Sequence, residues 1–327
     1  MIEVVVPIVS LFAILLAFVT YLVLRFNRGK MKVDKEWERS KVQKITHFGA
    51  TKSLVVLPLV DWYTSAEDLK GEAGVSYLVK TDDKTILFDV GLNSGRNDPS
   101  PLLHNMEKLG LTQNDFDAIV ISHNHGDHVG GSKWKRRKSF SLSNRQVDLG
   151  KKDVYTPEPM SYPGLKPVYA EKPTVIAQGI ATIGPISNQD FFLGRIREQA
   201  VAVNVSGRGI VLVVGCGHQT MPRIIERAEA LFEEPIYGLV GGLHYPVTDS
   251  RLKVMGIGVQ KYLGTCRFPW RPITMAVVQE NIALLKQRNL GIVAISAHDS
   301  CDASIARFQE AFQGAFREIK VGQRIVI

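Results

Sequence analysis

The motif Ser122-His123-Asn124-His125-Gly126-Asp127-His128 follows an apolar run, residues 118–121, that is typical of a buried strand. It holds three of the chain's eight histidines and one carboxylate within six positions. Imidazole and carboxylate groups are ligands that zinc and similar divalent ions accept. Burying several polar rings at a strand end is costly unless each ring has a partner. The motif therefore predicts a metal site rather than a set of hydrogen-bonded turn histidines.

Three further apolar runs of the sequence also end near a histidine. They are residues 210–214 before His218, residues 236–240 before His244 and residues 292–295 before His298. Because strand ends of a packed sheet gather at one edge, side chains that are distant in the sequence can share a site there. Any one of these histidines alone could be structural, but their matching positions predict that they join the motif.

The spacing within the motif suggests two ions. His123 and His125 alternate along an extended strand end and can reach one ion, whereas Asp127 and His128 follow a glycine turn and can reach a second one. Each ion still lacks a protein ligand, and the candidates are two of the other strand-end histidines, His218 and His298.

The expected chemistry is hydrolysis by a metal-bound hydroxide, because a bound divalent ion lets water ionise near neutral pH. Asp127 and His244 are the expected catalytic residues. We expect one or two Zn²⁺ ions per chain, with Mn²⁺ and Fe²⁺ as alternatives. Cys216 lies two residues before His218 but has no evident set of activating groups for nucleophilic catalysis.

The N-terminus contains an uninterrupted apolar run, residues 4–24, that is long enough to cross a membrane as a helix. A cleaved signal peptide is the alternative, but the first three residues carry no basic charge and no clear cleavage site follows. Four basic residues lie directly after the run and only Glu3 lies before it. The sequence therefore predicts a single-pass anchor, residues 1–24, with the catalytic domain in the cytoplasm.

Most of the net charge of +8 lies in two short segments. Residues 25–44 hold eight basic and three acidic residues and are expected to form a juxtamembrane helix or tether, either on anionic headgroups or simply solvated. Residues 133–138 hold five basic residues, which are expected to be solvated; the alternatives are that they attract an anionic substrate or touch the membrane surface. The remainder is nearly balanced, so no nucleic-acid partner is expected.

The rest of the chain, residues 45–327, is expected to form one strand-rich catalytic domain. The whole chain is 45% hydrophobic and 22% charged, which excludes bulk disorder, and its three widely spaced cysteines give no disulfide framework. Residues 133–192 contain many prolines and are expected to form loops and short strands beside the site. Residues 245–273 are expected to be an insertion. Strands are expected at 54–57, 75–79, 85–88, 118–121, 201–205, 210–214, 236–240 and 292–295, and helices at 102–109, 221–232 and 275–288.

The histidine motif, with Phe88-Asp89-Val90-Gly91 upstream, resembles the metallo-β-lactamase superfamily. Further segments resemble its branch labelled 7,8-dihydropterin-6-yl-methyl-4-(β-D-ribofuranosyl)aminobenzene-5′-phosphate synthase; they are residues 72–76, 215–218, 241–244 and 297–298. The resemblance covers roughly residues 45–327. It implies an α/β fold, the four-layer αβ/βα sandwich, with metals at the rim between two sheets. It also implies that Asp89 supports the metal loop rather than binding metal.

The sequence departs from this family at two positions. Many members place a metal-bridging Asp where this chain has Cys216, and the branch usually continues its last histidine as His-Cys-Thr-Gly, where this chain has His298-Asp299-Ser300-Cys301. The sequence is therefore compatible with one metal ion per chain and with two. The leading hypothesis is a membrane-anchored metal-dependent hydrolase of a small ester, lactone or phosphoester that is either neutral or anionic. The alternatives are a synthase or transferase of a phosphorylated dihydropterin precursor and a non-enzymatic, metal-stabilised scaffold.

Overall fold

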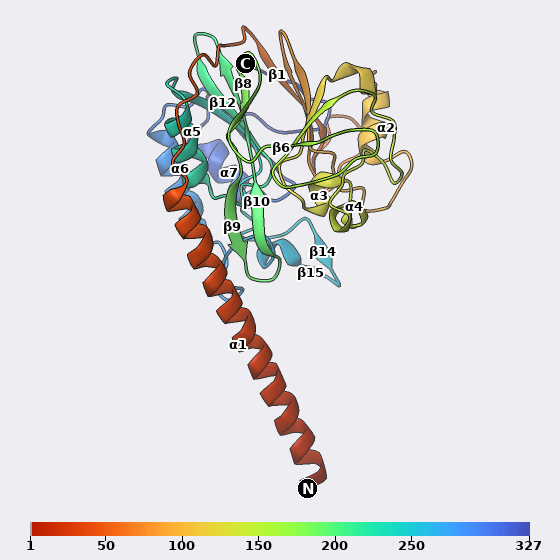
Figure 1. The fold of residues 1–327 in the computed structure, drawn as a ribbon, viewed down its shortest axis with the longest axis vertical. Helices are drawn as coiled ribbons and strands as arrows, with labels where there is room; N and C mark the ends of the chain where they lie inside the picture. The colour runs from red at the N-terminus through yellow and green to blue at the C-terminus, as the bar shows by residue number, and fades with distance from the viewer. Residues whose placement is uncertain (1) are drawn as a thin grey trace.

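Two mixed β-sheets pack face to face, and helices cover both outer faces (Figure 1). The structure, a computed structural model, describes residues 2–327, so residue 1 of the predicted anchor lies outside the described residues. The arrangement is the four-layer αβ/βα sandwich of the α/β class, and the fold predicted from the sequence is confirmed.

The first sheet has seven strands, and its outer face is covered by α2 (Pro101–Lys108) and the short α4 (Ser132–Arg136). Its first strands pair antiparallel and those from β3 onward pair parallel. In spatial order they are β17 (Ile325–Val326), β1 (Leu54–Val60), β2 (Ser76–Thr81), β3 (Thr85–Phe88), β4 (Ala118–Val120), β5 (Asp153–Thr156) and β6 (Val168–Tyr169).

The second sheet has six strands, and three helices cover its outer face: α5 (Met221–Leu231), α6 (Met275–Lys286) and α7 (Asp302–Ala311). In spatial order the strands are β16 (Ile292–Ile295), β13 (Ile236–Gly241), β12 (Gly209–Val214), β11 (Val201–Val205), β8 (Ile180–Thr182) and β7 (Thr174–Ala177). β12, β13 and β16 run parallel, so their carboxyl ends meet at one edge.

The central core fills the space between the two sheets. Tyr77 and Phe88 of the first sheet share one buried cluster with Val203 and Val211 of the second sheet. Because the central strands are covered on both faces, they appear in the sequence as continuous apolar runs rather than as alternating ones. This burial is what made β11, β12, β13 and β16 recognisable from the sequence.

The N-terminal helix α1 (Ile2–Arg39) extends away from the domain, and the two termini lie at opposite ends of the molecule (Figure 1). Its apolar part is long and hydrophobic enough to cross a membrane, and most of that stretch is not buried in the protein. The helix is therefore not a core element of the domain.

The C-terminal half of α1 packs against the domain. Phe26 and Val33 are buried, and the ring centroid of Phe26 lies 4.6 Å from that of Phe268. Asp34 forms an ion pair of 2.7 Å with Arg223 of α5. The predicted tether is thus helical up to Arg39 and fixed to the domain rather than simply solvated.

Two hairpins project from the end of the domain at which α1 emerges (Figure 1). One joins β9 (Ile186–Asp190) to β10 (Gly194–Glu198), and the other joins β14 (Lys253–Val254) to β15 (Ile257–Gly258). Neither hairpin was predicted from the sequence. β9 and β10 are rich in polar residues, and β14 and β15 are too short to show a period. The remaining short elements are α3 (Gly126–Val129), η1 (Gln113–Asp115) and η2 (Val259–Lys261).

Candidate metal centre

The histidine motif leaves β4 as an extended segment and then turns into α3. Asp89, directly after β3, holds the two ends of the motif together. Its Oδ1 atom accepts a 2.7 Å hydrogen bond from the Ser122 N–H, and its Oδ2 atom lies 2.6 Å from Ser122 Oγ and 2.7 Å from Nδ1 of His128. Since Asp89 binds Nδ1, the Nε2 atom of His128 remains available to the site.

The other strand-end histidines reach the same edge. His218 follows β12, His244 follows β13 and His298 follows β16, which are adjacent parallel strands of the second sheet. The structure thus brings all six predicted metal ligands and the predicted catalytic His244 together between the two sheets.

The first group of side chains consists of His123, His125 and His218. The ring centroid of His123 lies 4.6 Å from that of His125 and 4.8 Å from that of His218, and the last two rings are 5.0 Å apart. Three imidazoles from two sheets therefore surround one small space.

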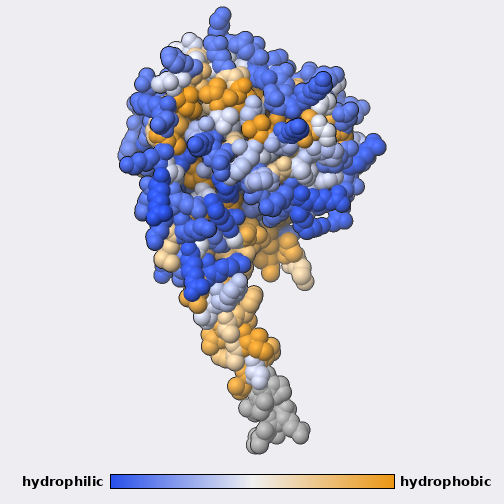
Figure 2. Space-filling view, viewed as in Figure 1, coloured by the Kyte–Doolittle hydropathy of each residue, from blue (hydrophilic) through white to orange (hydrophobic). Residues whose placement is uncertain are grey.

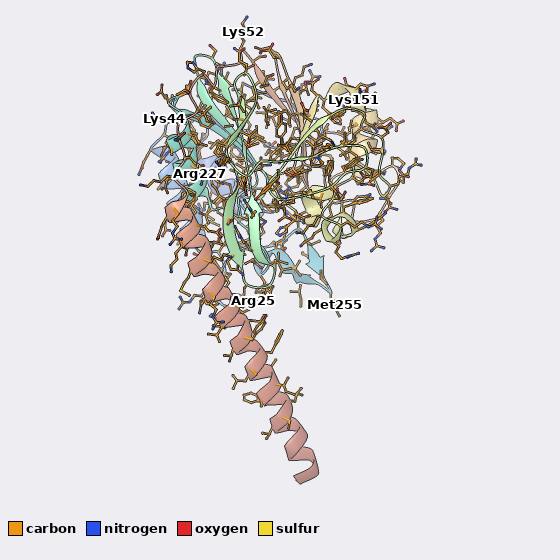
Figure 3. All side chains as sticks on the ribbon, in the orientation of Figure 1. Arg25, Lys44, Lys52, Lys151, Arg227 and Met255 are labelled. Atoms are coloured by element: carbon orange, nitrogen blue, oxygen red, sulfur yellow. The ribbon has the colours of Figure 1, made fainter. Side chains whose placement is uncertain are left out.

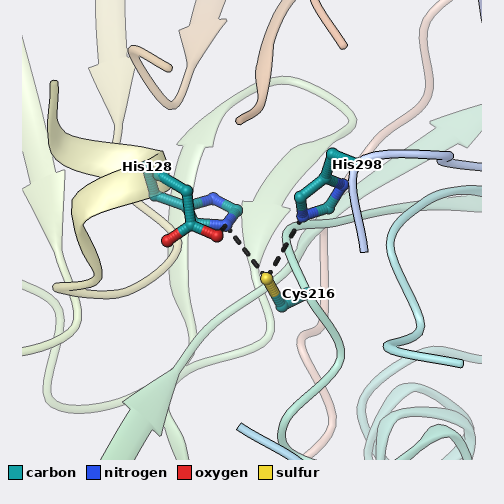
Figure 4. A group of neighbouring side chains, drawn as sticks. His128, Cys216 and His298 are labelled. Carbon is teal, nitrogen blue, oxygen red and sulfur yellow. Dashed lines mark hydrogen bonds and ion pairs between the residues drawn. The ribbon is translucent and has the colours of Figure 1, made fainter. Parts of the chain in front are cut away.

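The second group consists of Asp127, His128, His298 and Cys216, whose candidate ligand atoms all lie within 4.8 Å of one another. The Sγ atom of Cys216 lies 3.0 Å from Nε2 of His128 and 3.2 Å from Nε2 of His298 (Figure 4). Cys216 also lies within 4.8 Å of the candidate atoms of His123 and His218. The thiol is therefore placed between the two groups.

Two buried imidazole nitrogens test whether these residues fit a metal ion. Nε2 of His123 and Nε2 of His218 are buried and have no hydrogen-bond partner among residues 2–327. The opposite nitrogen of each ring is held, by Ser122 Oγ at 2.9 Å and by the Gly264 carbonyl at 2.7 Å. A buried, unpaired polar atom is costly, and a cation between the rings would satisfy both nitrogens. The donor set fits a divalent ion.

Burial also sets the protonation states that metal binding needs. It lowers the pKa values of His218 and His298 well below the usual range and that of His125 to about 3, which favours neutral imidazole, the form that binds metal. Burial raises the pKa of the Cys216 thiol. A nearby divalent cation would oppose this effect by favouring the thiolate.

His244 lies beside the first group, with its ring centroid 5.0 Å from that of His218. Its Nε2 atom is 3.0 Å from the Leu263 carbonyl, to which it donates a hydrogen bond, whereas the buried Nδ1 atom has no partner in the described chain. Its backbone N–H donates to Asp299 at 2.9 Å, and its φ of 53° is unusual for a residue with a side chain. His244 is thus held as a neutral acceptor at the edge of the site.

A carboxylate that could not be predicted from the sequence supports the loop after β12. Glu198, at the end of β10, accepts hydrogen bonds from the backbone N–H groups of Cys216, Gly217 and His218 at 2.9, 2.9 and 2.7 Å. Burial raises the pKa of Glu198 to about 7. Nothing in its local sequence marks Glu198, because the contact depends on how a hairpin packs across the sheet.

A pocket of about 270 Å³ gives access to the site. Its inner wall carries candidate ligands, which include His125, Asp127, Cys216 and His218. The pocket is also lined by Lys135 and by the exposed Leu193 and Leu252. The pocket thus combines candidate ligand atoms with one basic side chain and two apolar ones.

The fold and the histidine motif match a known family. The sequence model described as "Metallo-beta-lactamase superfamily" matches residues 69–139, which include the whole motif and Asp89. Residues 69–139 lie in a metallo-β-lactamase superfamily domain. The resemblance seen in the sequence is thereby confirmed. Most members of this superfamily that are enzymes are hydrolases, and the fold binds divalent metals, usually zinc.

One curated relative and two solved structures are similar to this chain. The 7,8-dihydropterin-6-methyl-4-(β-D-ribofuranosyl)-aminobenzene-5′-phosphate synthase of Methanocaldococcus jannaschii is 23% identical over 249 residues, covering 62% of this chain and 83% of the relative. A solved metal-dependent hydrolase of the β-lactamase superfamily superposes with a TM-score of 0.56 at 17% identity, over 84% of this chain and 99% of the other. The metallo-β-lactamase fold protein YhfI of Bacillus subtilis gives a TM-score of 0.50 at 13% identity, over 84% and 100%.

Proposed function

We propose that this protein is a metal-dependent hydrolase whose centre is formed by the two groups of side chains described above. His123, His125 and His218 would hold one divalent ion, and Asp127, His128 and His298 would hold a second, with Cys216 between them. The observation that carries the proposal is the pair of buried, unpaired Nε2 atoms of His123 and His218, which face a set of further ligand atoms.

A bound Zn²⁺, Mn²⁺ or Fe²⁺ ion would lower the pKa of a water molecule and polarise an oxygen of the substrate. The chain's own groups supply the remaining tasks. Asp127 is partly exposed to the pocket. Although burial alone would raise the pKa of Asp127, the neighbouring His128 holds it well below its usual range, so that the carboxylate stays ionised and can act as an acceptor. His244 offers its free Nδ1 atom as an acceptor beside the same pocket. Lys135 on the pocket wall favours an anionic small-molecule substrate.

We further propose that residues 45–327 are the catalytic domain of a single-pass membrane protein and that this domain faces the cytoplasm. The length and apolar character of α1 support an anchor. Arg25, Arg28, Lys30 and Lys32, which directly follow its apolar part, favour the cytoplasmic orientation.

A second candidate function is synthase chemistry on a phosphorylated dihydropterin precursor. The observation that favours it is the Methanocaldococcus jannaschii relative, which is named as such a synthase and is covered over 83% of its length. The basic Lys135 would suit a phosphorylated substrate as well as it suits an anionic ester.

The test uses the full-length protein in detergent or nanodiscs. We expect the protein to contain bound metal and to hydrolyse an ester, lactone or phosphodiester probe. The His125→Ala variant should lose both metal and turnover, and the Asp127→Asn variant should lose turnover. His47→Asn is the matched control, because His47 is exposed and lies outside the site. Thermal protection by a phosphorylated dihydropterin without hydrolysis of any probe would favour the synthase. Metal binding with neither activity would favour a scaffold.

A further inference from the structure

Exposed hydrophobic side chains gather on the parts of the domain beside the emerging α1 (Figure 2). Phe192 and Leu193 form the turn between β9 and β10. Met255, at the turn between β14 and β15, is 97% exposed, and its neighbour Ile257 is 59% exposed. Trp270 is 58% exposed. We call these five residues the apolar rim. Such a group on the surface of a soluble domain usually marks a binding surface.

The apolar rim lies at the end of the domain where α1 emerges. Arg25, which directly follows the predicted membrane span, donates a 2.7 Å hydrogen bond to the Phe191 carbonyl at the β9–β10 turn. Arg25 and Met255 lie at the same end of the domain, opposite to Lys52 (Figure 3). A bilayer that contained the apolar part of α1 would therefore have its surface at the rim.

One residue of the rim, Leu193, also lines the pocket. Leu193 of the rim and the neighbouring Leu252, before β14, line the pocket that also contains Asp127 and His218. The two hairpins thus connect the surface beside the membrane span with the candidate metal centre. A molecule that entered between them would pass apolar side chains before it reached the ligand groups.

A hydrogen-bond network links the rim to the metal centre. Asp190 Oδ1 accepts the backbone N–H groups of Phe192 and Leu193 at 3.0 and 2.9 Å. Its Oδ2 atom accepts the N–H of Gly264 at 2.9 Å, and the Gly264 carbonyl holds Nδ1 of His218 at 2.7 Å. The position of the rim and the orientation of a metal ligand therefore depend on one buried carboxylate.

We propose that the apolar rim docks into the bilayer surface and that the pocket takes its substrate from the membrane, as an amphiphile with an apolar chain and a hydrolysable ester-type head. This substrate class rests on the proposed function. Aromatic and aliphatic tips beside basic residues suit an anionic membrane interface, and Arg28 and Lys32 of α1 supply that charge. The continuity of the rim with α1 favours a bilayer over a second protein.

The docking is tested without activity. Met255→Cys in the full-length protein is labelled with an environment-sensitive fluorophore, since the three native cysteines are buried. The protein is placed in phosphatidylcholine–phosphatidylglycerol vesicles, with Lys52→Cys as the matched control. We expect a blue-shifted emission and quenching by spin-labelled lipids at position 255 only. Equal, water-like emission at both positions would overturn the docking. A blue shift at position 255 that appears only at high protein density in the vesicles would also overturn it, because it would report contact with a second copy of the protein.

The substrate class is tested with p-nitrophenyl acetate in solution and p-nitrophenyl palmitate in the same vesicles. We expect Met255→Asp, checked for an unchanged metal content, to reduce palmitate turnover at least about tenfold and to leave acetate turnover within about twofold. Equal effects on both esters would overturn the membrane route. If the wild-type protein turns over neither ester, the ester-hydrolase function and this substrate class both fail, whereas the label at position 255 still decides the docking.

Discussion

Lys30 on α1 donates a 2.7 Å hydrogen bond from Nζ to Oδ1 of Asn188 on β9, across 158 positions of the sequence. The amide of Asn188 in turn donates a 2.6 Å hydrogen bond to the backbone carbonyl of His218. Two consecutive hydrogen bonds thus connect the helix that carries the predicted anchor with His218, a candidate metal ligand. The juxtamembrane part of α1 belongs to the support of the site.

Lys30→Met is expected to destabilise the domain by about 1–2 kcal/mol, because a partly buried, charge-assisted hydrogen bond is lost. It should also weaken metal binding, since Asn188 is less firmly held. Unfolding and metal affinity are measured in detergent, with the exposed Lys32→Met as the control. Equal values for the two variants would show that α1 does not support the site. A protein that begins at residue 25 should likewise be more stable than one that begins at residue 45.

Asp89→Asn is expected to weaken metal binding by about 10–100-fold, the usual effect of removing the partner that orients a metal-binding histidine. The carboxylate of Asp89 holds His128 and Ser122 but lies outside the proposed ligand set. Competition with a chelator measures the affinity. Asp117→Asn is the control, because Asp117 is an exposed acceptor for the Thr85 N–H. An unchanged affinity in Asp89→Asn would exclude the supporting role.

Cys216→Ala is expected to reduce the metal content of the second group, because Sγ lies within 3.2 Å of both His128 and His298. Cobalt-loaded wild-type protein should show a thiolate-to-metal absorption band that this variant lacks. Cys216→Asp should keep the metal but lose the band. Cys301→Ser is the control, since Cys301 lies outside the candidate groups. Persistence of the band in Cys216→Ala would mean that Cys216 is not a ligand.

Asp82 gives a pH-dependent prediction away from the site. The backbone N–H of Lys52, together with Ser53, holds the pKa of this carboxyl well below its usual value of 3.8. A lowered folded-state pKa stabilises the protein above the unfolded-state pKa, and this stabilisation is lost as the pH falls toward the folded-state pKa. Asp82→Asn should therefore be less stable than wild type at pH 7, and the difference should shrink below about pH 4. The neighbouring Asp83→Asn is the control; a difference that does not depend on pH would contradict the prediction.

The sequence predicted the sheets well because the central strands are buried on both faces. β12, β13 and β16 each appear as an apolar run that ends in His218, His244 or His298. That coincidence, together with the motif after β4, was enough to group residues from four strands. In the structure, the ligand atoms of Asp127, His128, His298 and Cys216 form one group. His123 belongs to two others, one with His125 and Asp127 and one with Cys216 and His218.

The sequence could not predict the supports of the site. Glu198 and Asp190 act through backbone N–H groups, which leave no trace in residue type or spacing. The contact between Lys30 and Asn188 depends on how α1 lies against β9. The β14–β15 hairpin consists of two-residue strands around a tight turn, too short for any period to be seen.

The most direct test of the central claim is anomalous diffraction from crystals of the zinc-loaded protein, measured on both sides of the zinc absorption edge. We predict an anomalous peak between His123, His125 and His218, with nitrogen ligands at about 2.0–2.1 Å. If a second ion binds, a further peak should lie near Asp127, His128, His298 and Cys216. Zinc-loaded crystals without an anomalous peak among these residues would contradict the assignment of a metal centre.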